Sequence, residues 1–196
     1  MTAQTLQYPS LVNVIWDKPS WTRNIILLAA GVVLLTVSAK LKIPFYPVPM
    51  TMQTFMVLVI GMAFGWRLGA ATLFAYLAAG AMGLPVFAGT PEKGLGLVYM
   101  TGPTGGYLLG FLLGAIATGF LAERGWDRRA STTFLAMLVG NIIIYVPGLM
   151  WLGAVLGWEK PIIEWGLTPF LLGDLAKIAL AMLVMPAAWK LVGRKH

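Results

Sequence analysis

The sequence predicts an all-α integral membrane protein, a six-helix bundle with both termini on the cytoplasmic side (N-in/C-in). Three observations predict this fold. First, 59% of the 196 residues are hydrophobic and 11% are charged, whereas soluble domains carry about 25% charged residues. Second, the mean hydropathy is +0.81, and long apolar runs recur along the chain. Third, lysine and arginine are distributed unevenly among the predicted loops. We therefore expect a multi-pass protein of the cell (cytoplasmic) membrane.

The chain is expected to form a single transmembrane domain over residues 1–196, with residues 1–23 as a cytoplasmic tail. The six spans are predicted at about 24–41, 51–64, 68–82, 104–122, 130–156 and 168–192. Prolines at 44, 47 and 49 exclude a helix interior between the first two spans. Irregular backbone at membrane depth is tolerated where protein buries it or where it lines a cavity. Because this segment and the long segment from Gly83 to Pro103 are both rich in apolar residues, we expect ordered outer loops between helices 1 and 2 and between helices 3 and 4.

Basic residues orient the predicted bundle. With both termini inside, the outer segments hold Lys40, Lys42, Lys93 and Lys160. The cytoplasmic segments hold more than twice as many, namely Lys18, Arg23, Arg67, Arg124, Arg128, Arg129, Lys190, Arg194 and Lys195. This excess on the inside is typical of membrane proteins. It accounts for the net charge of +7 without a nucleic-acid partner.

The residue inventory excludes several kinds of chemistry. The chain has no cysteine, and its one histidine is the last residue, His196. Disulfides, thiol nucleophiles, a Ser-His-Asp triad, a histidine-ligated metal site and a histidine proton relay are therefore not expected. We predict that the protein is not an enzyme and carries no cofactor or metal.

Asp174 and Lys177 are the most informative candidate residues. They lie inside the last predicted span, where an ionised side chain costs about 3 kcal/mol or more on insertion scales. Three residues apart, they share one helix face. The pair can present an acceptor and donors to a small polar ligand, or it can neutralise itself and do no more than fix helix packing. We expect the first, about 9 Å below the outer surface.

Other polar and glycine residues are candidates for the same site. Asn141 and Tyr145 share one face of the fifth predicted helix, and Gln53 begins the second. The backbone N–H groups of Gly105 and Gly106, at a helix start, can hold a carboxylate, although these glycines can equally form a simple turn. A polar cavity near the outer face suits capture of a solute from outside.

At this point several motifs become recognisable. The sequence resembles the BioY family, the biotin-specific substrate-binding (S) components of energy-coupling factor (ECF) transporters, from about Asn24 to Lys190. The resemblance is carried by residues 43–54 (IPFYPVPMTMQT), 83–87 (GLPVF), 102–107 (GPTGGY), 141–145 (NIIIY) with Gly148 and Trp151, and 169–177 (PFLLGDLAK).

The resemblance implies a protein that binds biotin, as transported ligand, at its outer face and works with a transmembrane T component and two cytoplasmic ABC-type ATPases. Membrane lipid surrounds it, and self-association is left open. On this basis Asp174 is expected to accept from a ureido N–H of biotin and Lys177 to donate to the ureido carbonyl, with Asn141 near the same ring. The remaining expected contacts are Gln53 from the lid side, the carboxylate beside Gly105 and Gly106, and the aromatic residues Tyr46, Tyr107, Tyr145 and Trp151.

Three alternatives remain from the residues alone: an S component for another vitamin, a stand-alone gradient-driven transporter, and an intramembrane enzyme. The reverse biotin orientation, with Lys177 on the carboxylate, is also open. Family members often carry an Ala-xxx-Ala stripe on the first helix for docking the T component. Here Gly31, Leu35 and Ala39 stand at that spacing instead, so the docking face is not assigned.

Overall fold

The computed structural model describes residues 8–193, and they form helices, one small sheet and the connections between them. The elements are α1 (Leu11–Ile15), α2 (Trp21–Lys40), β1 (Lys42–Ile43), β2 (Met50–Thr51), α3 (Gln53–Ala81), α4 (Gly96–Met100), α5 (Gly105–Ala122), α6 (Ala130–Leu156), α7 (Ile162–Gly166) and α8 (Thr168–Gly193). The first seven residues of the predicted tail, together with Arg194, Lys195 and His196, lie outside the described part.

Five stretches of helix in residues 8–193 are long and apolar enough to cross a membrane: α2, α3, α5, α6, and α7 together with α8. The predicted second and third spans are joined in α3, which breaks at Gly65 (φ 78°, ψ 169°). A Cβ on Gly69 would lie 3.2 Å from the Gly61 Cα, so the two halves fold back on each other. The break therefore lies where the sequence predicts a turn. The six-span count and the N-in/C-in orientation stay predictions.

Glycines bring the central helices into close contact. The most extensive helix contacts are those of α3 with α5 and of α5 with α6. A Cβ on Gly110 would lie 2.6 Å from the carbonyl oxygen of Ile144, and one on Gly61 would meet the backbone of Ala115. These glycines thus let the helix backbones approach to a distance that no larger residue allows.

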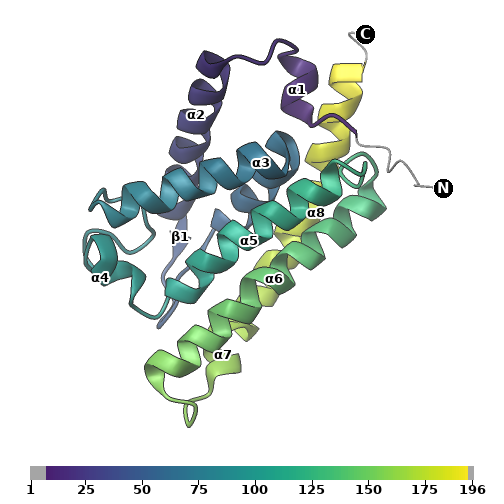
Figure 1. The fold of residues 1–196 in the computed structure, drawn as a ribbon. Coiled ribbons are helices and arrows are strands. Elements are labelled where there is room, and N and C mark those ends of the chain that lie inside the picture. The colour runs from purple at the N-terminus through teal and green to yellow at the C-terminus, as the bar shows by residue number, and fades with distance from the viewer. Residues whose placement is uncertain (1–7, 194–196) are drawn as a thin grey trace, which may run out of the picture.

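The two connections expected to be ordered lie at the same end of the long helices as α7, opposite the two chain ends (Figure 1). Residues 42–51 form an antiparallel hairpin in which Lys42 pairs with Thr51 and Ile43 with Met50. The long segment between α3 and α4 is packed: Phe87 is fully buried and Ala88 is nearly so. Both segments are therefore ordered, as predicted, and they cover the end of the bundle where the candidate site lies.

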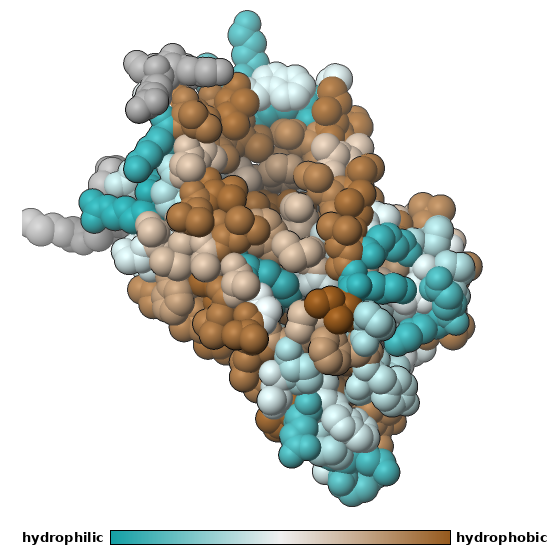
Figure 2. Space-filling view, turned by 180° about the vertical axis from the view of Figure 1, so that it is seen from behind, coloured by the Kyte–Doolittle hydropathy of each residue, from teal (hydrophilic) through white to brown (hydrophobic). Residues whose placement is uncertain are grey.

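The surface carries a broad apolar band. Large exposed hydrophobic residues occur on the long helices, among them Val33, Leu109, Ile142 and Leu183. Figure 2 shows apolar side chains across the middle of one face, with hydrophilic ones gathered mainly toward one end. An exposed apolar band of this kind is the surface that lipid covers in a membrane protein.

Candidate functional site

Asp174 and Lys177 form a buried ion pair on α8. Lys177 Nζ lies 2.9 Å from Asp174 Oδ1, and both side chains are more than 90% buried. The three-residue spacing places them on one helix face, as expected. Because α8 begins at Thr168, the pair lies inside the span, where a lone charge would be costly. Each charge therefore neutralises the other.

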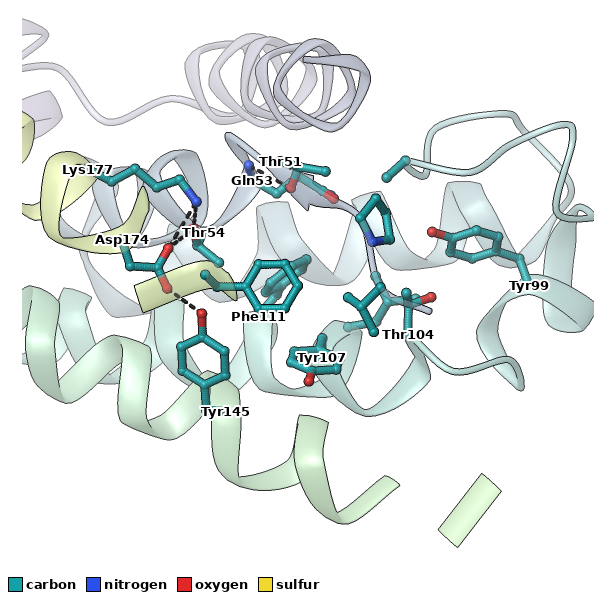
Figure 3. A pocket seen from close by; sticks show the side chains of 15 residues that line it. Thr51, Gln53, Thr54, Tyr99, Thr104, Tyr107, Phe111, Tyr145, Asp174 and Lys177 are labelled. Carbon is teal, nitrogen blue, oxygen red and sulfur yellow. Dashed lines mark hydrogen bonds and ion pairs between the residues drawn. The ribbon is translucent and has the colours of Figure 1, made fainter. Parts of the chain in front are cut away.

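Two other helices contribute hydroxyl groups to this ion pair. Thr54, near the start of α3, accepts from Lys177 Nζ at 2.9 Å and donates to Asp174 Oδ1 at 3.2 Å. Tyr145 of α6 donates its phenolic hydrogen to Asp174 Oδ2. Figure 3 shows these four side chains, which we call the acid–lysine cluster, converging from α3, α6 and α8. The cluster joins three helices through polar contacts.

The acid–lysine cluster retains unused hydrogen-bonding positions. An ionised carboxylate offers about four acceptor positions, and Asp174 receives three hydrogen bonds, from Thr54, Tyr145 and Lys177. The Lys177 ammonium has three hydrogens, and two are directed to Thr54 and Asp174. A ligand that carries an N–H beside a carbonyl oxygen can use the acceptor and the donor that remain.

The acid–lysine cluster forms one wall of a cavity of about 520 Å³, including the part that opens to solvent. Among its lining residues are several aromatic side chains, and the rings of Tyr107 and Tyr145 meet edge to face at 6.2 Å. The lining residues are Val48, Pro49, Thr51, Gln53, Thr54, Ala88, Tyr99, Thr104, Tyr107, Leu108, Phe111, Tyr145, Phe170, Asp174 and Lys177. The cavity therefore has one charged, polar end and a mainly aromatic and apolar remainder.

Residues 86–90, between α3 and α4, form a wall beside the cavity, which we call the 86–90 wall. Lys40, the last residue of α2, and Lys42 of β1 hold its carbonyl groups. Lys40 Nζ donates to the carbonyls of Phe87 at 2.9 Å and Thr90 at 2.8 Å. Lys42 Nζ donates to the carbonyl of Ala88, a cavity-lining residue, at 3.1 Å. The α2 terminus thus fixes the position of this wall.

Aromatic hydroxyl groups hold the rest of the 86–90 wall. Tyr76 donates to the carbonyl of Val86 at 2.9 Å and accepts from Gln53 Nε2 at 2.7 Å. The backbone N–H of Gly89 donates to the hydroxyl of Tyr99 at 3.3 Å. Each residue of the wall therefore has a backbone group bonded to a side chain of another segment. Gln53, which lines the cavity, is linked to the wall through Tyr76.

Within residues 8–193, no three His, Cys, Asp or Glu side chains gather in a way that could hold a metal ion. The lining residues of the cavity offer hydrogen bonding, ion pairing and aromatic contact. These are the interactions of a binding site for an organic solute.

A model of the BioY family matches residues 5–194 of the chain. The chain belongs to the BioY family. It is 37% identical over 162 residues to a probable biotin transporter BioY of Pyrococcus horikoshii, covering 83% of this chain and 93% of that one. It is 39% identical over 161 residues to the biotin transporter BioY of Thermotoga maritima, covering 81% and 92%.

The fold also matches a solved structure, that of the S-component for biotin from an ECF-type ABC transporter. The TM-score is 0.69 at 22% identity, and the match covers 88% of this chain and 95% of the other. At this identity the likeness concerns the fold. It indicates that the arrangement of helices around the cavity is that of an S component.

In this BioY-family chain, half of the ten residues expected at the site line the cavity. They are Gln53, Tyr107, Tyr145, Asp174 and Lys177. They come from α3, α5, α6 and α8. The structure therefore brings together residues from the second predicted span to the last, as the motif order of the family implies.

The other five expected residues do not line the cavity. The Tyr46 side chain is 82% exposed, on the β1–β2 hairpin. Trp151 donates its indole N–H to the carbonyl of Gly102 at 2.9 Å. The backbone N–H of Gly105 also donates to the carbonyl of Gly102, at 3.0 Å. A Cβ on Gly106 would lie 2.9 Å from the carbonyl carbon of Pro147 and nearer still to the carbonyl oxygen. Both glycines thus allow close backbone packing at the start of α5.

Asn141 occupies an intermediate position. It is buried, it does not line the cavity, and its amide oxygen has no hydrogen-bond partner among the described residues. It precedes Tyr145 by one helical turn on α6, and so lies one turn below the acid–lysine cluster.

Sequence reasoning missed several lining residues. Thr54 was overlooked although it follows Gln53 directly, because a threonine in an apolar helix also bonds its own backbone and gives no distinct signal. Thr51 and Thr104 were overlooked as ordinary residues at helix starts. Phe111 and Phe170 could not be separated from the many lipid-facing apolar residues, since every face of these helices is apolar.

Proposed function

We propose that this protein is the biotin-binding S component of an ECF transporter and mediates biotin uptake across the cytoplasmic membrane. The observation that carries the proposal is the buried acid–lysine cluster at the end of an aromatic cavity, in a chain of the BioY family. Relatives that cover most of the chain are named biotin transporters. The protein acts as a carrier and not as an enzyme. A transmembrane T component and cytoplasmic ATPases supply the energy, as in the transporter type to which the structural neighbour belongs.

The ureido ring of biotin fits the unused positions of the acid–lysine cluster. The ring carries two N–H groups beside one carbonyl oxygen. One N–H donates to the free acceptor position of Asp174, and the carbonyl accepts from the remaining Lys177 hydrogen. Hydrogen bonds with an ionised partner are about twice as strong as neutral ones. Because the cluster is buried, water competes little for these positions.

The sulfur-containing ring and the valerate chain extend through the aromatic part of the cavity. Tyr107, Phe111 and Phe170 supply apolar and aromatic contacts to the bicycle, and sulfur interacts favourably with aromatic rings. The carboxylate lies near the outer mouth, where Thr51 and Thr104 offer hydroxyl groups. This end is the wetter one, and it suits a charged group that must not be buried alone.

The proposal includes a membrane topology. The single domain spans the cytoplasmic membrane six times, with the two halves of α3 as separate spans and both termini inside. The uneven distribution of basic residues supports this orientation. The cavity then faces the outside, below the β1–β2 hairpin and the 86–90 wall, where extracellular biotin can enter.

Biotin binding by the purified protein tests the proposal. The protein is expressed in cells that contain biotin, and bound biotin is measured after purification. Calorimetry then compares the wild type with Asp174→Asn and Lys177→Ala. We expect each substitution to weaken binding by about 2–5 kcal/mol, because truncating one partner of a buried charged pair leaves the other unpaired. Lys160→Ala, at an exposed position of the α6–α7 connection, is the matched control and should bind normally.

Analogues separate the competing assignments. Biotin amide keeps the ureido ring but lacks the anionic carboxylate, so it should bind in the proposed orientation and fail in the reverse one. A panel of other vitamins should not compete. If Asp174→Asn and Lys177→Ala fold and bind biotin normally, the site is assigned wrongly. Uptake in ATP-free vesicles that hold an ion gradient would instead indicate a stand-alone transporter.

A further inference from the structure

A second hollow lies at the opposite end of the molecule, where α1, the α5–α6 connection and the end of α8 meet. It is an open groove of about 860 Å³, including the part in contact with solvent. Its lining shares no residue with the cavity and contains two cations and no carboxylate among the described residues. We call this hollow the terminal groove. Its lining residues are Tyr8, Pro9, Val14, Arg128, Pro186, Trp189, Lys190, Val192 and Gly193.

Arg128 is held in the terminal groove by two aromatic rings. Its guanidinium carbon lies 4.4 Å from the centre of the Tyr8 ring and 4.1 Å from that of the Trp189 ring. Stacking of this kind occupies the flat faces of a guanidinium. Its N–H groups point outward in the plane of the group, so hydrogen bonds leave from the edge. The planar fork of arginine matches two oxygens of a phosphate.

Arg128 keeps hydrogen-bond donors without an acceptor within residues 8–193. Its Nε is buried and donates to no acceptor there, and no ion pair of Arg128 occurs among the described residues. The neighbouring acid, Asp127, is fully buried and accepts from the Trp189 indole N–H at 2.6 Å. Asp127 thereby fixes the ring on which Arg128 rests, and it does not line the terminal groove. Within residues 8–193 Arg128 therefore forms no salt bridge, although the buried Asp127 interacts with its charge, and Arg128 lines an open groove.

The apolar part of the groove lining indicates which kind of molecule carries the hydrogen-bond acceptor for Arg128. Val14, Pro186 and Val192 line the groove beside Arg128 and Lys190. The same part of α8 also carries the exposed apolar residues Leu183, Val184 and Leu191. A water-soluble anion would leave these apolar residues uncovered, whereas an acyl chain covers them.

We propose that the terminal groove binds an acidic phospholipid, with the headgroup phosphate on Arg128 and Lys190 and the start of an acyl chain along Val14, Pro186 and Val192. Two cations with no lining carboxylate complement an anionic headgroup. Basic grooves at the ends of membrane helices are suited to such lipids. This inference is independent of biotin binding, because the groove and the cavity lie at opposite ends of the long helices.

Lipid titration of the detergent-solubilised protein tests this inference. Native mass spectrometry counts bound phosphatidylglycerol and phosphatidylcholine as each is added to the wild type, Arg128→Gln, Lys190→Gln and Arg124→Gln. Arg124 is the matched control, because it is a basic residue of the same connection whose guanidinium packs on Phe120 instead. Each lysine or arginine that contacts the anionic headgroup changes the lipid affinity about fivefold. We expect the wild type to prefer phosphatidylglycerol at least tenfold, and Arg128→Gln and Lys190→Gln each to lose about fivefold.

Further measurements distinguish a lipid from a soluble anion or a protein in the terminal groove. Arg128→Lys keeps the charge but not the fork, so it should restore part of the preference. Biotin affinity, measured on the same samples, should be unchanged and shows that the variants are folded. Equal binding of the two lipids, or an equal loss in Arg124→Gln, would overturn the inference. So would displacement of the lipid by 10 mM inorganic phosphate or by an acidic peptide, since the occupant would then be a soluble anion or a protein partner.

Discussion

Gly80→Ala should displace the 86–90 wall. A Cβ on Gly80 would lie 2.8 Å from Phe87 Cε1 and nearer still to two other ring atoms, whereas carbon atoms pack best at about 3.5–4.0 Å. The Phe87 ring cannot turn aside easily, because it stacks on Tyr99 at 5.0 Å and meets Tyr76 edge-on at 5.4 Å. Overpacking of about 3 kcal/mol exceeds the helix-propensity gain of about 1 kcal/mol. The net cost is about 2 kcal/mol.

Two assays check this cost. Thermal unfolding in detergent, followed by tryptophan fluorescence, should show a melting temperature lower by about 4–8 °C. Biotin calorimetry should show weaker binding, because Ala88 follows Phe87 directly and lines the cavity. Phe87→Leu removes the ring atoms that the new Cβ would meet, so Gly80→Ala should cost almost nothing in that background. If the cost of Gly80→Ala is the same in both backgrounds, or is absent in the wild type, the wall is not held as described.

Three other outcomes are expected. Lys40→Met removes the donor to the carbonyls of Phe87 and Thr90. Because Lys40 is exposed, the 86–90 wall should lose about 1 kcal/mol of stability. Amide hydrogen exchange across residues 86–90 should then be faster, while the control Lys93→Met should leave it unchanged. Gly110→Ala should destabilise more than Gly80→Ala, since its Cβ meets backbone of α6 that cannot turn away. Burial raises the pKa of the Asp127 carboxyl to about 6, so the folded state holds the proton more tightly than the unfolded state. The melting temperature should therefore fall as pH rises from about 4 to about 6 and then level off, and Asp127→Asn should remove that fall; an unchanged fall would exclude Asp127 as its source.

The helices and the ion pair follow from local rules, so they could be predicted from the sequence. Apolar length predicts the spans, and the three-residue spacing of Asp174 and Lys177 fixes them on one face whatever the remainder of the fold. Gly65 was predictable as a break, since its turn needs a positive φ that glycine readily adopts. The short elements α1, α4 and α7 were not predicted, because five-residue helices form through tertiary contacts and not through their own sequence.

The contacts around the cavity depend on tertiary packing and were harder to predict. Lys40 and Lys42 look like lysines at a membrane surface, and nothing local indicates that they hold carbonyl groups nearly 50 residues away. Tyr46 and Trp151 are aromatic residues within family motifs, but one is exposed on a hairpin and the other bonds a backbone carbonyl. The motifs thus predicted which segments form the cavity, while the direction of each side chain required the fold.

The mutual neutralisation of Asp174 and Lys177 has an electrical consequence. The empty site contributes no net charge at its depth in the bilayer, whereas biotin at neutral pH brings one carboxylate. The loaded form therefore differs from the empty form by one negative charge. Moving a full elementary charge through the membrane field is worth about 2.3 kcal/mol per 100 mV. Moving this carboxylate inward must therefore work against an inside-negative potential, whereas the empty site adds no net charge to be moved.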